Sequence, residues 1–218
     1  MTKYPTFRLA GIALIFSLTG CAVEPATQAV LDAYKLQRAD GAESAGSLNP
    51  NYKYLRVQID DRVSFMAQGY VDPSPEGPVE VWYSTDRNVL KLLNGRIVGV
   101  TIKSGVDWSA VSFSHLPPWN ELGERAVFER TRDVSPGYNY GIRESMLIRR
   151  IPPPTDTNLK IVPASALIWY EETVQGDDHA RASRYALDLN KVVYAEQCLT
   201  AEFCLSWQNW PQSSKGKP

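Results

Sequence analysis

The segment VEVWYSTDRNVLKLLNGRIVGVT, residues 79–101, carries the clearest structural signal in the chain. Its first six residues are mostly β-branched or aromatic, and a short polar turn separates them from a second apolar run at Val89–Leu93. Asn94-Gly95 follows, and this pair strongly indicates a β-hairpin because both turn positions require positive φ. Arg96–Thr101 then forms a third apolar run, which is expected to pair with the second as an antiparallel strand. The segment therefore predicts three successive antiparallel strands.

The same alternation of apolar runs and turn residues extends in both directions from this segment. Further strands are expected at Tyr54–Ile59, Val63–Tyr70, Trp108–Phe113, Ala126–Arg132, Tyr138–Arg150, Leu159–Val162, Ala166–Val174, Ala182–Leu187 and Val192–Gln197. Many short strands with turns between them are typical of an all-β sandwich or barrel. We expect a mainly β domain, an antiparallel meander that closes into a barrel-like or sandwich fold. Pro152–Pro154 either divides two subdomains or lines a sheet edge.

The N-terminus has the features of a secretory signal. Lys3 and Arg8 precede an apolar run of about ten residues, Leu9–Leu18, which is too short to span a bilayer. The run ends in Leu18-Thr19-Gly20-Cys21, which resembles the bacterial lipobox. In proteins with that motif the signal is cut before the cysteine, whose sulfur receives a diacylglyceryl group and whose new amine is acylated.

We therefore expect Cys21 to carry the lipid, with residues 1–20 removed. The alternative is a cysteine that merely follows an uncleaved anchor. One acyl chain binds a membrane only marginally, whereas several hold a protein firmly. Residue 22 is Ala rather than the Asp that retains lipoproteins in the inner membrane. The expected location is thus the outer membrane, with the protein at its periplasmic face.

The rest of the chain divides into three parts. Residues 21–50 are expected to form a lipidated N-terminus with a short helix over 22–39 and a small polar tether. Residues 51–210 form the β-rich domain, and residues 211–218 a disordered tail.

Two cysteines remain, Cys198 and Cys204. In an oxidising compartment such a pair indicates a disulfide. A metal pair is the alternative, but no histidine lies nearby in the sequence and the spacing fits no zinc pattern.

Charge and motifs exclude several functions. Loss of residues 1–20 removes Lys3 and Arg8 and lowers the formal net charge from −1 to about −3, so nucleic-acid binding is not expected. The chain has no sequence motif of a known nucleophile, metalloprotease or nucleotide-binding site, and neither His115 nor His179 lies in a catalytic pattern. We expect no enzymatic activity, no cofactor and no metal.

Two carboxylates that face each other across a groove would give the chain a catalytic site for sugar cleavage. Asp60 with Asp61, and Glu171 with Glu172, are sequence neighbours, so on a strand their side chains point to opposite faces. Neither pair therefore forms a facing dyad by itself. A dyad built from carboxylates on distant strands remains an alternative.

Aromatic and basic residues are the better binding candidates, since sugars stack on aromatic rings. Trp82 and Tyr83 are adjacent on a predicted strand, so one of them points away from the core. Most tryptophans are expected in the core. Arg130, Arg132, Arg143, Arg149 and Arg150 form a basic stretch that either meets an acidic polymer or is a solvated strand face. The candidate contacts for polymer or partner are Trp82, Tyr83, Trp108, Arg130, Arg132 and Tyr138.

Several of these stretches resemble one family. GPVEVWYS (77–84), VLKLLNGRIV (89–98) followed by Asp107-Trp108, TRDVSPGY (131–138) and the hairpin Tyr185–Gln197 are similar to the YjbF/GfcB lipoproteins of exopolysaccharide and group 4 capsule operons. The resemblance covers most of residues 50–197 and the lipobox. It implies a barrel-like fold, outer-membrane lipidation and a role in polysaccharide production or export.

The resemblance also implies partners, namely an outer-membrane β-barrel protein and periplasmic proteins of the same operon, but no catalytic residue. The leading expectation is a non-enzymatic accessory lipoprotein that contacts the membrane through its anchor and binds the barrel partner, a polysaccharide, or both. The alternatives are a polysaccharide-modifying enzyme with a carboxylate pair and a purely structural envelope lipoprotein.

Overall fold

The computed structural model describes residues 51–103, 107–135, 137–160 and 162–210. Within these ranges nearly all regular structure is β-strand, and one short 3-10 turn covers Ala164–Ala166. No helix in this part of the chain is long and apolar enough to cross a membrane.

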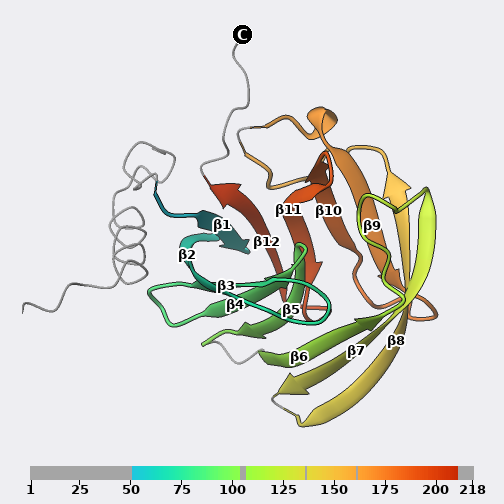
Figure 1. Ribbon diagram of the computed structural model, residues 1–218, viewed down its shortest axis with the longest axis horizontal. Helices are drawn as coiled ribbons and strands as arrows, with labels where there is room; N and C mark the ends of the chain where they lie inside the picture. Colours follow the sequence, from blue (N-terminus) through green and yellow to red (C-terminus); the bar gives the residue numbers. More distant parts are fainter. Residues whose placement is uncertain (1–50, 104–106, 136, 161, 211–218) are drawn as a thin grey trace, which may run out of the picture.

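Twelve antiparallel strands form a closed barrel in which each strand pairs with its sequence neighbours and β12 pairs with β1 (Figure 1). The strands are β1 (Tyr54–Ile59), β2 (Arg62–Asp72), β3 (Val79–Tyr83), β4 (Val89–Leu93), β5 (Arg96–Thr101), β6 (Asp107–Ser114), β7 (Arg125–Ser135), β8 (Asn139–Ile151), β9 (Ile168–Val174), β10 (Ser183–Asp188), β11 (Lys191–Cys198) and β12 (Cys204–Trp210). The predicted meander is thus confirmed, and it closes as a barrel rather than a sandwich. Because β1 pairs with β12, neither terminal strand is left as a free edge. Among the described residues, β5 and β6 pair only at Val100–Trp108 and Thr101–Asp107.

The Asn94-Gly95 hairpin forms as its sequence predicts. Both residues have positive φ, 49° and 85°, and they connect β4 to β5. Gly95 is required for a second reason, because a Cβ there would lie 2.5 Å from the Cβ of Val192. The turn therefore packs directly against the start of β11.

Alternation of side chains along each strand separates the inside of the barrel from the outside. On β1, Leu55 and Val57 point into the main core, whereas Tyr54 belongs to a separate cluster with Phe65 and Trp210 on the outer surface. A third cluster, built around Trp169 and Tyr194, also lies outside. The barrel thus has an apolar interior and two apolar patches on its wall.

Two strand predictions need correction. The segment 159–162 contains no strand in its described residues; Leu159 and Val162 instead pack against the outer cluster around Trp169 and Tyr194. An apolar run on a loop that covers a sheet resembles a strand in sequence. The second correction is β12, which the sequence prediction missed. The expected helix over residues 22–39 lies outside the described residues.

The three prolines at 152–154 do not divide two subdomains. They open the long connection from β8 to β9, and all twelve strands belong to the same barrel. This connection runs along the outside of the barrel, where the backbone of Asn158 and Lys160 donates to Tyr194 Oη and Gln208 Oε1.

The antiparallel order gives the barrel two distinct ends. The turns β1–β2, β7–β8, β9–β10 and β11–β12 lie at one end, which we call the distal end. Tyr54 and Trp210, where the chain enters and leaves the barrel, lie at the opposite end. The candidate site is at the distal end.

Candidate functional site

A buried ion pair crosses the barrel interior. Arg96 on β5 donates from Nε to Glu172 Oε1 on β9 at 2.7 Å, and its Nη2 lies 2.6 Å from the same oxygen. Both side chains are almost fully buried, with 2% and 3% exposed. A buried charge pair of this kind needs further partners to offset the loss of water.

Aromatic and amide groups supply those partners. The Arg96 guanidinium lies 3.9 Å from the centre of the Trp119 ring, which reaches it from the β6–β7 loop. The Tyr185 hydroxyl is 2.9 Å from Glu172 Oε2 and 3.1 Å from Gln197 Oε1. Burial and the Glu172 charge raise the pKa of Tyr185 well above its ordinary value, so this phenol stays protonated.

A second polar group lies closer to the distal end. Glu144 on β8 accepts hydrogen bonds from Arg130 Nε at 2.7 Å and from Arg132 at 2.9 and 2.8 Å. The two guanidinium carbons lie 5.3 and 5.1 Å from the centre of the Trp108 ring. One carboxylate and one aromatic ring therefore hold two arginines in fixed positions.

The ionisation of Glu144 follows from these contacts. Burial opposes its charge, but the hydrogen bonds from Arg132 and Arg130 outweigh that effect and lower the pKa of the carboxyl below its ordinary value. Glu144 is therefore ionised near neutral pH and neutralises only one of its two arginine partners.

These groups line a pocket of about 160 Å³ at the distal end. One water needs about 10–15 Å³, so the pocket has room for a small organic group. Trp108, Arg130, Arg132 and Glu144 form one wall. The turns β9–β10 and β11–β12 form the opposite wall, with residues 177, 179–181 and 198–201, and Glu172 lies between the walls. Strand register shifts next to Trp108 and Arg132, and such bulges re-aim side chains at functional sites.

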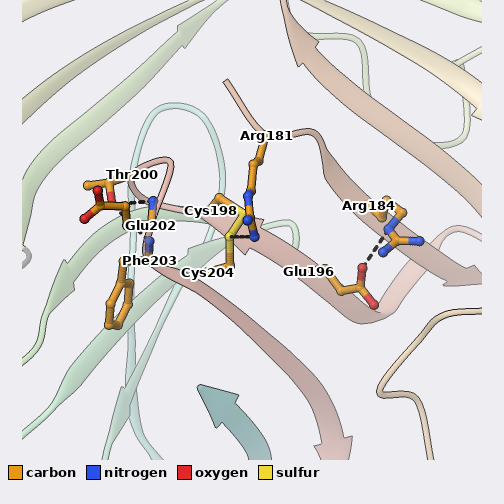
Figure 2. Close-up of a disulfide and its surroundings, with 8 residues drawn as sticks. All are labelled: Arg181, Arg184, Glu196, Cys198, Thr200, Glu202, Phe203 and Cys204. Carbon is orange, nitrogen blue, oxygen red and sulfur yellow. Dashed lines mark hydrogen bonds and ion pairs between the residues drawn. A yellow bond between two sulfur atoms is a disulfide. The ribbon is translucent and has the colours of Figure 1, made fainter. Parts of the chain in front are cut away.

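A disulfide fastens the β11–β12 turn that forms part of this pocket (Figure 2). Cys198 and Cys204, the two disulfide candidates, are directly opposite each other on the two strands and are bonded in the structure. Within the turn, the backbone of Glu202 and Phe203 donates to the Thr200 hydroxyl. Arg181, from the β9–β10 turn, lies over the bridge with Nη1 3.7 Å from Cys204 Sγ.

The sequence candidates separate into three groups. Trp108, Arg130 and Arg132 come together at the pocket. Trp82 is only 2% exposed in the barrel core, so it is excluded as a polymer contact because nothing outside can reach its ring. Tyr83 lies on the outer face, with its ring 6.3 Å from that of Tyr70. Hydrogen bonding to Tyr70 and partial burial raise the pKa of Tyr83 to about 12.

Tyr138 lies at the tip of the β7–β8 hairpin, 77% exposed, and does not line the pocket. The basic stretch of the sequence is likewise divided. Arg130 and Arg132 point into the barrel, whereas Arg143 is exposed and Arg149 pairs on the surface with Glu171. A strand turns successive side chains to opposite faces, so a linear cluster of arginines does not become a single patch.

Sequence reasoning missed Arg96, Glu144 and Arg181 as members of the site. Arg96 directly follows the Asn-Gly turn, and nothing in the local sequence marks it as a buried residue. Glu144 could be recognised as a partner of Arg130 only from the pairing of β7 with β8, which places the two residues opposite each other. The pairing rule on opposite charges across strands could have found it once the register was known.

Glu171 and Glu172 face opposite sides of β9, as predicted: Glu171 binds Arg149 outside and Glu172 binds Arg96 inside. The described ranges hold no group of three or more side chains suited to bind a metal ion. Cys21 and its lipidation lie outside the described residues.

Comparison with known proteins shows a likeness to a solved structure. The chain is similar to the crystal structure of the hypothetical lipoprotein YmcC from Escherichia coli K12, with a TM-score of 0.61 and 16% identity over 91% of this chain and 100% of that one. No protein-family model and no curated protein matches the sequence. At this identity the likeness shows the fold: this chain has the same kind of β-structure as that lipoprotein.

Proposed function

We propose that this chain is a lipid-anchored accessory protein of the outer membrane that binds a polysaccharide in its distal pocket and takes part in the production or export of that polymer. The pocket carries the proposal. It places two oriented arginines, a carboxylate and an aromatic ring around one cavity, and groups of these kinds bind the hydroxyl and acidic groups of sugars.

Three further observations support this proposal. The sequence stretches that resemble the YjbF/GfcB lipoproteins lie within the barrel, and the lipobox-like Leu18–Cys21 supplies an anchor. The fold is shared with a protein described as a lipoprotein. The pocket opens at the end opposite Tyr54, so a chain anchored at its N-terminus would present the pocket away from that entry point. An outer-membrane β-barrel protein and periplasmic proteins of the same operon are the proposed partners.

The charges in the pocket favour binding over catalysis. Glu144 and Glu172 both line it, as a carboxylate dyad would require. A general acid, however, needs a raised pKa. The pKa of Glu144 is instead lowered by Arg132 and Arg130, and Glu172 is held by Arg96. A sugar-cleaving enzyme is therefore the second candidate, and cleavage of polymer that stops in Glu144→Gln or Glu172→Gln would favour it.

A genetic experiment tests the accessory role. Deletion of the gene is expected to lower the amount of surface or secreted polysaccharide, and the wild-type gene should restore it. A Cys21→Ser gene should restore it poorly, because the protein then leaves the membrane. Unchanged polysaccharide after deletion would contradict the proposal and favour a purely structural envelope protein.

A further inference from the structure

The distal pocket, together with Arg96 beneath it, holds four arginines and three carboxylates, which is an excess of one positive charge. Arg130 and Arg132 share the single carboxylate of Glu144. Glu172 is neutralised by Arg96 beneath it. Arg181, on the opposite wall, has no carboxylate within ion-pair distance among the described residues. Asp177 is the remaining acid, and its carboxylate accepts from the backbone N–H groups of its own turn.

Unused hydrogen-bond donors face this space. Arg130 bonds Glu144 only through Nε, and its two terminal amino groups donate no hydrogen bond within the described part of the chain. Neither group is among the buried unpaired atoms of the described residues, and the Arg130 side chain lines the pocket. Arg181 is exposed, and its one hydrogen bond to the described residues goes to a sulfur, which is a weak acceptor.

The geometry of these donors suits a planar anion. A guanidinium binds a carboxylate through two parallel N–H groups, which gives both energy and orientation. Arg130 is held in advance by Glu144 and by the Trp108 ring, so little rotamer entropy is lost when a ligand binds. Glu144 and Asp177 line the same pocket and can accept hydrogen bonds from sugar hydroxyls, and the Thr200 hydroxyl can donate one.

We infer that the pocket binds a carboxylate-bearing sugar unit, such as a uronic acid residue, with its carboxylate on the guanidinium groups of Arg130 and Arg181. This inference rests on the proposed function and names the chemical class of its ligand. A neutral sugar would leave the excess charge and the unused donors without a partner. The polymer is therefore acidic, and the pocket recognises one unit of it at a time.

Titration calorimetry with the full mature chain in detergent tests this inference. The probes are a short galacturonic acid oligomer, the matching neutral galactose oligomer and galactose 6-phosphate. The uronate should bind at least about tenfold more tightly than the neutral oligomer, as expected for a charge-assisted hydrogen bond, and added salt should weaken it. The inference would be overturned if the neutral oligomer bound as tightly as the uronate oligomer. It would also be overturned if galactose 6-phosphate bound more tightly than the uronate.

Two variants with the same net charge locate the site. Arg181→Gln removes an exposed pocket arginine and should weaken uronate binding by about tenfold. Arg143→Gln removes an exposed arginine from the outer face of β8 and should leave binding unchanged. If both variants weaken uronate binding equally, the loss comes from overall charge. That result would overturn the assignment of binding to the distal pocket.

The same variants separate the two proposals. If the uronate does not bind but the organism's own polysaccharide does, and Arg181→Gln weakens that binding, the ligand class is wrong while the polymer-binding function holds. If neither ligand binds, both proposals fail.

Discussion

Single residues create the polar groups that lie inside this otherwise apolar barrel. Glu144 does this by holding two arginines, at a position where burial alone would favour the neutral acid. Its ionised form therefore depends on Arg130 and Arg132, and their orientation depends on it. Such mutual dependence has consequences for stability that can be measured.

Glu144→Gln is expected to destabilise the protein by about 1–3 kcal/mol at neutral pH, because two partly buried arginines lose their shared acceptor. The folded-state pKa of Glu144 lies below the unfolded one. The stabilisation is therefore complete above the unfolded pKa of about 4.3 and is lost as the pH falls through the folded value. Urea unfolding of wild type and variant from pH 7 to pH 3 measures this. A stability gap that persists unchanged at pH 3 would contradict the assignment.

Gly95 offers a residue-scale test with a matched control. Gly95→Ala combines a positive φ of 85° with a clash against Val192, whereas Gly176→Ala has a similar φ of 78° and no neighbouring atom within 4 Å. Gly176→Ala should therefore show only the backbone strain, about 1 kcal/mol, and Gly95→Ala clearly more. Thermal unfolding of both variants measures the difference, and equal losses would mean that the turn does not pack on β11.

The sequence predicted those elements whose conformation is determined by residues close together in the chain. The segment 79–101 forms the three strands that its pattern indicates, because alternation and the Asn-Gly turn act within a few residues. β12 was missed because its neighbours in space, β1 and β11, determine its role as the closing strand. The pocket was missed for the same reason: Trp108, Glu144 and Arg181 meet only through strand register and barrel closure. Periodicity predicts on which face of its strand a side chain lies. It does not predict which residues of distant strands that side chain contacts.

The β11–β12 turn is the element on which one pocket wall depends. The disulfide closes a short loop, so its loss is expected to lower the unfolding free energy by on the order of 2 kcal/mol. Leu199 stays buried in the core, which anchors the start of the turn. Replacing both Cys198 and Cys204 by serine should therefore leave the barrel folded while it loosens residues 199–203.

Amide hydrogen exchange measures this loosening. Exchange should accelerate in the β11–β12 turn and remain slow at Ala186 and Ala195, which lie at the centre of the adjoining hairpin. Acceleration throughout β10 and β11 would contradict a local role for the disulfide.

At the scale of the whole molecule, closure between β1 and β12 joins the two ends of the domain. Val57 and Trp207 are cross-strand partners in the core, 150 residues apart in sequence. Their amides should therefore exchange as slowly as those of Ala186 and Ala195. Fast exchange confined to β1 and β12 would show an open sheet with two edges instead of a barrel.

The whole molecule is also the scale at which the proposed function applies, since a lipid anchor and a distal pocket matter only together. Cosedimentation of the full mature lipoprotein in liposomes with the organism's surface polysaccharide measures both at once. We expect the wild-type protein and Arg143→Gln to retain the polymer on the liposomes, and Arg181→Gln to retain about tenfold less at equal protein. Polymer that stays in solution with the wild-type protein, or that binds equally to all three proteins, would contradict a polysaccharide-binding role for the distal pocket.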